Sequence, residues 1–229
     1  ESYSYFMIKK LFGKLKTPFA KTYVPFGTLI CQEELIAALK KSKDDFEIKG
    51  SDKGKAVVIK ASAKNPLLKM IKKDILDAYE KSIAKAGGID LQIIGVGGRG
   101  HVAFHESGIP LNHKMLLVKL DDNTIQNAVK DGHFATVEDS PNYAISLGAA
   151  LVYKAKTVML LANGERKIRP VAESILGPVT ADVPISYGQK FSADGGNMIY
   201  ILDVIAASGL KGKEKELKAK GIKVIDKTK

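Results

Sequence analysis

His101 and Glu106 are the residues of this chain whose types and spacing best suit proton transfer. They stand five positions apart, directly after four glycines within six residues: Gly95, Gly97, Gly98 and Gly100. A histidine titrates near neutral pH, and a neighbouring carboxylate can orient the ring and hold its charged form. Glycines let the backbone adopt positive φ angles and approach a ligand closely. The segment therefore predicts a site for proton shuttling on a sugar-sized ligand.

The same glycines also fit the pattern Gly-x-Gly-x-x-Gly after a strand, which is typical of dinucleotide-binding sites. Such sites carry an acidic residue at the end of the following strand, about twenty residues further along. The sequence offers no convincing acidic residue at that place. We therefore favour a tight turn at a catalytic site over dinucleotide binding.

A second segment with possible chemistry runs from Met159 to Lys167, where an apolar stretch passes through Asn163-Gly164 into a predicted helix. Lys167 falls in the first turn of that helix. Backbone N–H groups at a helix N-terminus attract anions, so a lysine there predicts a phosphate site. The simpler interpretation is a lysine that faces solvent, and spacing alone favours it.

These two segments must be positioned by a fold in which helices and strands alternate, which indicates a parallel sheet covered by helices. Ligands collect beyond the carboxyl ends of such strands, where both segments fall. We expect one domain over residues 1–229. The predicted strands are 55–61, 90–96, 115–120, 158–162, 183–187, 198–204 and 222–226. The predicted helices include 2–15, 32–42, 66–86, 121–131 and 210–221.

Composition narrows the class of protein further. The 229 residues include one cysteine, Cys31, which cannot form an internal disulfide, so a reducing cytoplasmic location is expected. No apolar run is long enough to span a membrane. The net charge of +11 suggests anionic partners. Lysines supply most of the positive charge and lie scattered without aromatic residues between them, so the sequence does not favour nucleic acid as the partner.

The two segments together resemble the glucosamine-6-phosphate deaminase/6-phosphogluconolactonase family. That family ends a strand in Gly-x-Gly-x-Asp-Gly-His, and its deaminase branch continues Ile-Ala-Phe-Asn-Glu-Pro. Here the chain reads Gly95-Val-Gly-Gly-Arg-Gly-His-Val-Ala-Phe-His-Glu106. Residues 140–148, residues 158–167 and the opening residues 1–7 are also similar to family segments. The resemblance is weakest over residues 28–64, and it favours the deaminase branch over the lactonase branch.

The resemblance implies roles for individual residues. His101 matches a histidine that assists sugar ring opening, and Glu106 matches the carboxylate that orients it. Lys167 matches a lysine that binds the substrate phosphate, and Lys130 matches an arginine that contacts it. Gly97 and Gly98 are expected to bring the backbone close to that substrate.

For the whole chain, the resemblance implies a Rossmann-like, mostly parallel α/β sheet with helices on both faces, like that of deaminases, ribose-5-phosphate isomerases and CoA transferases. It also implies aldose–ketose isomerisation of a phosphorylated amino sugar with loss of ammonia, without a metal or redox cofactor. A homo-oligomer is left open beside a monomer.

Two departures from the family keep other functions open. Arg99, which we expect to belong to the catalytic residues with His101 and Glu106, replaces the turn aspartate by a permanent cation. Such a cation disfavours a second positive charge on His101 or binds an acidic group itself. The family's base at C2 is an aspartate in an Asp-Glu-Tyr segment that this sequence does not contain, so we expect the first strands of the sheet to be lacking here. A non-catalytic sugar-phosphate-binding relative and a 6-phosphogluconolactonase therefore stand as alternatives.

Overall fold

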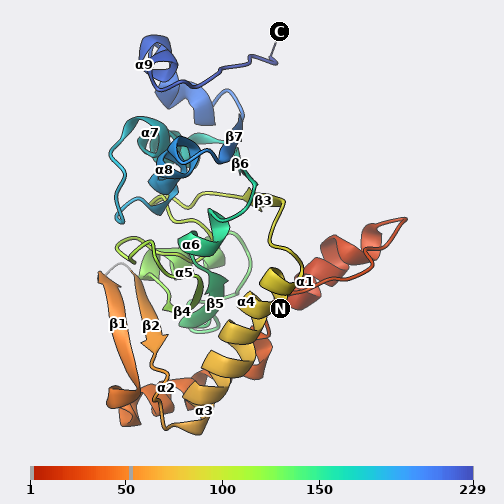
Figure 1. Ribbon diagram of the computed structural model, residues 1–229, viewed down its shortest axis with the longest axis vertical. Coiled ribbons are helices and arrows are strands. Elements are labelled where there is room, and N and C mark those ends of the chain that lie inside the picture. The colour runs from red at the N-terminus through yellow and green to blue at the C-terminus, as the bar shows by residue number, and fades with distance from the viewer. Residues whose placement is uncertain (1–2, 52–53, 229) are drawn as a thin grey trace.

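The computed structural model describes residues 3–51 and 54–228 of the chain. Two sheets carry the fold (Figure 1). A parallel sheet has the order β3-β6-β7, formed by β3 (Leu91–Ile94), β6 (Thr157–Ala162) and β7 (Asn197–Leu202). An antiparallel sheet has the order β1-β2-β4-β5, formed by β1 (Phe46–Ser51), β2 (Gly54–Ile59), β4 (Met115–Lys119) and β5 (Tyr143–Leu147).

The helices surround these sheets at the ends of the molecule and between them. Their bounds are α1 Tyr3–Lys10, α2 Gln32–Lys41, α3 Pro66–Met70, α4 Ala78–Lys85, α5 Asp122–Lys130, α6 Ala149–Val152, α7 Ile168–Leu176, α8 Tyr187–Ala193 and α9 Glu214–Ala219. A π-helical stretch, η4 (Ile71–Asp77), joins α3 to α4. Short 3-10 turns stand before or after several helices, among them η5 (Glu165–Lys167) and η6 (Pro184–Ser186).

Sequence chemistry explains several element boundaries. Pro66 starts α3 and needs no N–H partner there, while the Asn65 side chain accepts hydrogen bonds from the backbone N–H groups of Leu67 and Leu68. Gly87 and Gly88 follow α4 with φ angles of 88° and 97°, which glycine adopts without strain. The predicted helix over 66–86 is therefore confirmed, although its middle turns are π-helical.

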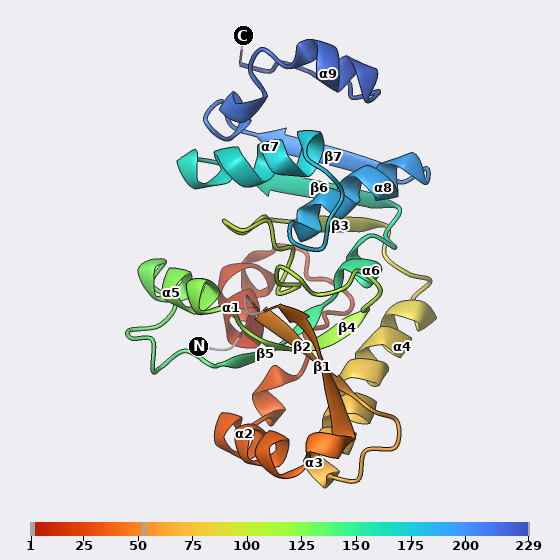
Figure 2. The same ribbon diagram turned by 90° about the vertical axis from the view of Figure 1, so that its left-hand side faces the viewer.

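The parallel sheet is packed on one face. Val158 and Leu160 of β6 are fully buried beneath α7 and α8, together with Val171 and Ile185. Figure 2 shows these two helices lying across the strands. On the opposite face the side chains of Leu91, Ile93, Leu161 and Ile201 remain 45–55% exposed.

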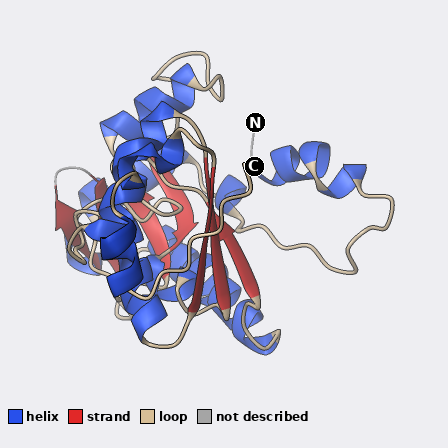
Figure 3. Cartoon of the chain, turned by 90° about the horizontal axis from the view of Figure 1, so that it is seen from above, coloured by secondary structure: helices blue, strands red, loops and turns tan. Residues whose placement is uncertain are grey.

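Figure 3 views this sheet edge-on, with helices gathered on one side and the N-terminal segment projecting on the other. The expected α/β class with a parallel sheet flanked by helices is thus confirmed. The expectation of helical cover is met on one face of the sheet.

Three strand predictions differ from the structure. Residues 183–187 form η6 and the start of α8, because Pro184 has a fixed φ and no N–H for a ladder. Residues 222–226 join no ladder. Residues 115–120 are a strand, as predicted, but β4 belongs to the antiparallel sheet, where it pairs with the unpredicted strand β5.

Candidate functional site

The glycine turn that follows β3 positions His101. The Gly97 N–H donates to the His101 carbonyl at 3.1 Å, and the Gly100 N–H donates to the Gly97 carbonyl at 2.9 Å. A Cβ on Gly97 would lie 2.2 Å from His101 Nε2, so the imidazole fills the space that a side chain there would need. Gly100 has a φ of 78°, which favours glycine. Gly97 and Gly100 therefore shape the turn that positions His101.

His101 and Glu106 meet as predicted. Nδ1 of His101 lies 3.0 Å from Oε2 of Glu106, and the Glu106 side chain is 2% exposed. The other oxygen, Oε1, accepts a 2.7 Å hydrogen bond from the hydroxyl of Thr124 and a longer one, 3.4 Å, from the N–H of Asp121. Both carboxylate oxygens are thus engaged, which satisfies a buried charge. This network leaves Nε2 as the imidazole atom available to a ligand.

The first residue of β2 lies against the side chain of Glu106. Gly54, whose φ is 135°, stands so close that an added Cβ would be 2.3 Å from the Glu106 Cβ. Ser51 donates its hydroxyl hydrogen to the carbonyl of Ser107 at 3.2 Å. The segment after Glu106 is fixed on its other side by Ser107, whose hydroxyl donates to the Asp182 carbonyl at 2.6 Å. Two elements distant in sequence therefore enclose Glu106.

The Arg99 side chain forms an ion pair at the start of α5. Its guanidinium NH1 lies 3.0 Å from Oδ2 of Asp121, whose side chain is 8% exposed. Oδ1 of Asp121 accepts a hydrogen bond from the Asn123 N–H, so Asp121 also caps α5. The cation that replaces the family's turn aspartate is therefore paired with a carboxylate.

Lys167 reaches the glycine turn from η5. Its ammonium donates a 2.6 Å hydrogen bond to the carbonyl of Val96, five residues before His101. Burial and the neighbouring Arg166 lower the pKa of Lys167, and Asp131 partly opposes that shift. Among the described residues, its ammonium forms no ion pair. A half-buried cation held only by a carbonyl is well placed to bind an anion.

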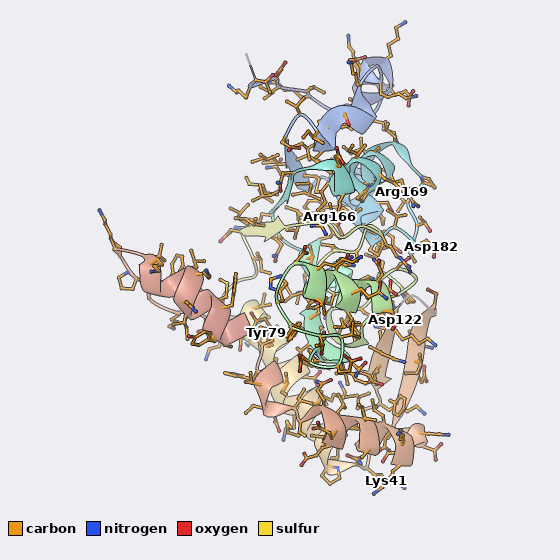
Figure 4. All side chains as sticks on the ribbon, turned by 180° about the vertical axis from the view of Figure 1, so that it is seen from behind. Lys41, Tyr79, Asp122, Arg166, Arg169 and Asp182 are labelled. Carbon is orange, nitrogen blue, oxygen red and sulfur yellow. The ribbon has the colours of Figure 1, made fainter. Side chains whose placement is uncertain are left out.

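Lys130 and Gly98 are less closely engaged. Lys130 is the exposed last residue of α5, and the next residue, Asp131, forms an exposed ion pair with Arg166 at 3.0 Å. Figure 4 shows Arg166 between α7 and the helix that carries Asp122. Gly98 lies exposed in the turn with open space around its Cβ position. Their expected roles toward phosphate stay predictions.

His105 has a structural role beside the site. It is fully buried, and its Nε2–H donates to the Ile109 carbonyl at 2.9 Å while Nδ1 accepts from the Ala149 N–H at 2.9 Å. Burial lowers its pKa to about 4. A neutral imidazole with both nitrogens used in this way ties the loop after His101 to the start of α6.

No helix in the described part of the chain has the length and apolar character needed to cross a membrane. Within residues 3–51 and 54–228, no group of three or more His, Cys, Asp or Glu side chains is arranged to hold a metal ion.

Comparison with known proteins identifies the family. The chain is 34% identical over 213 residues to a glucosamine-6-phosphate deaminase of Oenococcus oeni, covering 93% of this chain and 70% of the relative. It is 36% identical over 210 residues to that of Enterococcus faecalis, covering 92% and 69%. The chain belongs to the glucosamine-6-phosphate deaminase family. No family model matches it.

Solved structures agree with this family at the level of the fold. A monomeric glucosamine-6-phosphate deaminase superposes with a TM-score of 0.54 at 18% identity, covering 78% of this chain and 82% of that one. The deaminase name carried by the sequence relatives gives the lactonase alternative less support.

Sequence reasoning missed Thr124, Asp121 and Gly54, although all three touch the deaminase-like centre. Asp121 stands at the start of a predicted helix, where an aspartate normally indicates an N-cap, and Thr124 follows in the first turn. Only the packing of α5 on the glycine turn shows that the same residues reach Glu106.

Proposed function

We propose that this chain is an amino-sugar-phosphate isomerase/deaminase, which converts a hexosamine 6-phosphate and water to a ketose 6-phosphate and ammonia. The observation that carries the proposal is the pair of partly buried His101 and buried Glu106, 3.0 Å apart, beside the turn that Lys167 contacts. The sequence relatives that share most of the chain carry the deaminase name.

In this proposal His101 acts first, at the ring oxygen of the cyclic sugar. Its Nε2 gives a proton to that oxygen as the bond to C1 breaks, which opens the ring to the aldose form. Glu106 keeps the imidazole oriented through Nδ1 and compensates its positive charge in the state that donates the proton. The half-buried carboxylate–imidazole pair needs no rearrangement for this step, since the hydrogen bond is already formed.

Lys167 anchors the substrate at the other end. The Lys167 ammonium, which has no carboxylate partner in the described part of the chain, can exchange its bond to the Val96 carbonyl for a charge-assisted bond to a phosphate. Lys130 extends this positive region from the end of α5. Isomerisation then moves a proton from C2 to C1, and hydrolysis of the resulting imine releases ammonia from C2.

A direct assay tests the proposal. The chain of residues 1–229 is incubated with glucosamine 6-phosphate, and ketose 6-phosphate and ammonia are measured together. We expect equimolar formation of both products, and no turnover of glucosamine that lacks the phosphate. A rate no higher than that of the His101→Asn variant, for glucosamine 6-phosphate and its epimers alike, would overturn the proposal.

A second candidate is a sugar-phosphate-binding relative without turnover. Its support is the ion pair between Arg99 and Asp121. Arg99 stands where the family has the turn aspartate, and here it is bound to the residue that caps α5. This candidate predicts a rise in the unfolding temperature with glucosamine 6-phosphate, because a ligand that binds the folded state stabilises it. The rise would be lost in Lys167→Met while no ammonia is formed by the unaltered chain.

A further inference from the structure

The carboxylate of Glu106 is oriented from a helix that lies outside the glycine turn. Thr124, in the first turn of α5, is 8% exposed, and its hydroxyl donates the 2.7 Å hydrogen bond to Oε1. Oε2 faces His101 at 3.0 Å. Because the two oxygens share one plane, fixing Oε1 also fixes where Oε2 presents its lone pairs.

The helix that carries Thr124 is itself attached to the site by its two ends. Arg99 of the glycine turn pairs with Asp121 just before α5, and Arg166 beside Lys167 pairs with Asp131 just after it. The chain has three arginines, Arg99, Arg166 and Arg169, against a large excess of lysines. Two of these three therefore join α5 to the loops that carry His101 and Lys167.

We propose that Thr124 is a positioning residue for the reaction, acting through Glu106, and that the Arg99–Asp121 ion pair holds α5 where the Thr124 hydroxyl can reach it. This inference rests on the proposed function for its kinetic consequence. Arg99 then contacts neither the sugar nor its phosphate. Arg99, at the position of the family's turn aspartate, then contributes to catalysis indirectly, by holding α5 in place.

The decisive variant is Thr124→Val, which keeps the shape of the side chain and removes its hydroxyl. We expect kcat to fall by roughly tenfold or more, the effect of losing one hydrogen bond to a charged group, while KM changes by less than about twofold. Thr124→Ser restores the hydroxyl and is expected to recover most of the activity. Thr136→Val makes the same replacement at an exposed position and controls for the loss of a hydroxyl as such.

A double-mutant cycle separates positioning from general damage. In a Glu106→Gln background, Thr124→Val is expected to add little, because the group through which Thr124 acts is already altered. Additive losses in the two backgrounds would overturn the inference. Unfolding temperatures of the four proteins show whether any loss comes from folding.

A measurement that needs no turnover keeps this inference distinct from the proposed function. The proton of the His101 Nδ1–Glu106 bond is expected to give a strongly downfield NMR signal, assigned by its loss in His101→Asn. Thr124→Val should shift or broaden it, and Thr124→Ser should preserve it. If the unaltered chain forms no ammonia but the signal responds in this way, the function fails and the positioning role stands. A signal indifferent to Thr124→Val would end the positioning role.

Discussion

The two ends of the site are built in opposite ways. At the end that we propose handles protons, Glu106 is buried, and its oxygens accept or share hydrogen bonds with His101, Thr124 and the Asp121 backbone. At the end that we propose binds phosphate, Lys167 is half-buried and its ammonium donates a hydrogen bond to the Val96 carbonyl. In the proposed mechanism, the His101–Glu106 pair acts on one atom of the substrate and is already held in place before the substrate binds. The Lys167 ammonium binds the phosphate and can exchange its present hydrogen bond for one to that group. Changes at the His101–Glu106 pair should therefore alter mainly kcat, and changes at Lys167 should alter mainly KM.

The variant with the largest expected effect on this difference between the two ends is His101→Asn. Removing the general acid should lower kcat by roughly 10²–10⁴-fold, the usual contribution of a positioned proton donor. KM for the phosphorylated sugar should change little, since Lys167 is untouched. Steady-state kinetics on glucosamine 6-phosphate check this. A variant that lost affinity but kept its kcat would show that His101 belongs to the binding end.

His105, four residues after His101, belongs to neither end of the site and is expected to affect stability instead of kcat or KM. Its folded-state pKa of about 4 lies below the ordinary value of 6.5, so the unfolded chain takes up this proton first. The stability that its neutral form provides is complete above pH 6.5 and is lost as the pH falls toward 4. The loss amounts to about 3 kcal/mol in the free energy of unfolding.

Urea titrations between pH 7 and pH 4 measure this loss. His105→Gln is expected to unfold more easily at pH 7 and to show a weaker dependence on pH over that range. A parent protein whose unfolding free energy stays level from pH 7 to pH 4 would contradict the assignment.

Gly97→Ala tests whether the fixed end depends on close packing. The new Cβ would lie 2.2 Å from His101 Nε2, so the ring must move away from its partner. We expect kcat to fall by about tenfold to a hundredfold, as for a small displacement of a positioned group. Gly95→Ala, with no atom within 4 Å of its Cβ position, is the matched control and should leave kcat nearly unchanged. Equal effects at the two glycines would refute the packing argument.

Lys167→Met tests the exchangeable end. The variant should raise KM by roughly tenfold, the effect of losing one charge-assisted hydrogen bond, with a smaller change in kcat. Lys85→Met, at an exposed position in α4, is the control. Because burial and Arg166 lower the pKa of Lys167, affinity should also decline at a lower pH than for an ordinary lysine. Arg166→Gln should move that decline to higher pH, and a decline that does not move would argue against Lys167 as the phosphate ligand.

Much of this architecture follows from local sequence. The long helix before β3, the strand β3 and the turn that brings His101 to Glu106 were predictable, because they depend on periodicity and on glycines next to each other in the chain. The burial expected for β3 was wrong, since Leu91 and Ile93 remain exposed at the edge of the sheet. The parallel strands β6 and β7 were also predictable. Each carries an apolar run bounded by turn residues.

What could not be predicted depends on contacts between distant segments. Residues 143–147 alternate large apolar and small side chains, which fits a strand, but five residues are too few to decide, and the pairing with β4 makes β5 a strand. The approach of Gly54 to Glu106 joins positions 52 residues apart. The pairing of Arg99 with Asp121 likewise needs the packing of α5 on the turn, which no local spacing encodes.

The uncovered side of the β3-β6-β7 sheet has a consequence for how copies of this chain behave in solution. Parallel sheets are normally covered on both faces. Among the described residues, Leu91, Ile93, Leu161 and Ile201 form an exposed apolar surface beside β3, which is an edge strand of this sheet. The net charge of +11 pushes copies apart. Salt weakens that repulsion, and sulfate strengthens apolar association. Solubility should therefore fall as ionic strength rises, and earliest in sulfate.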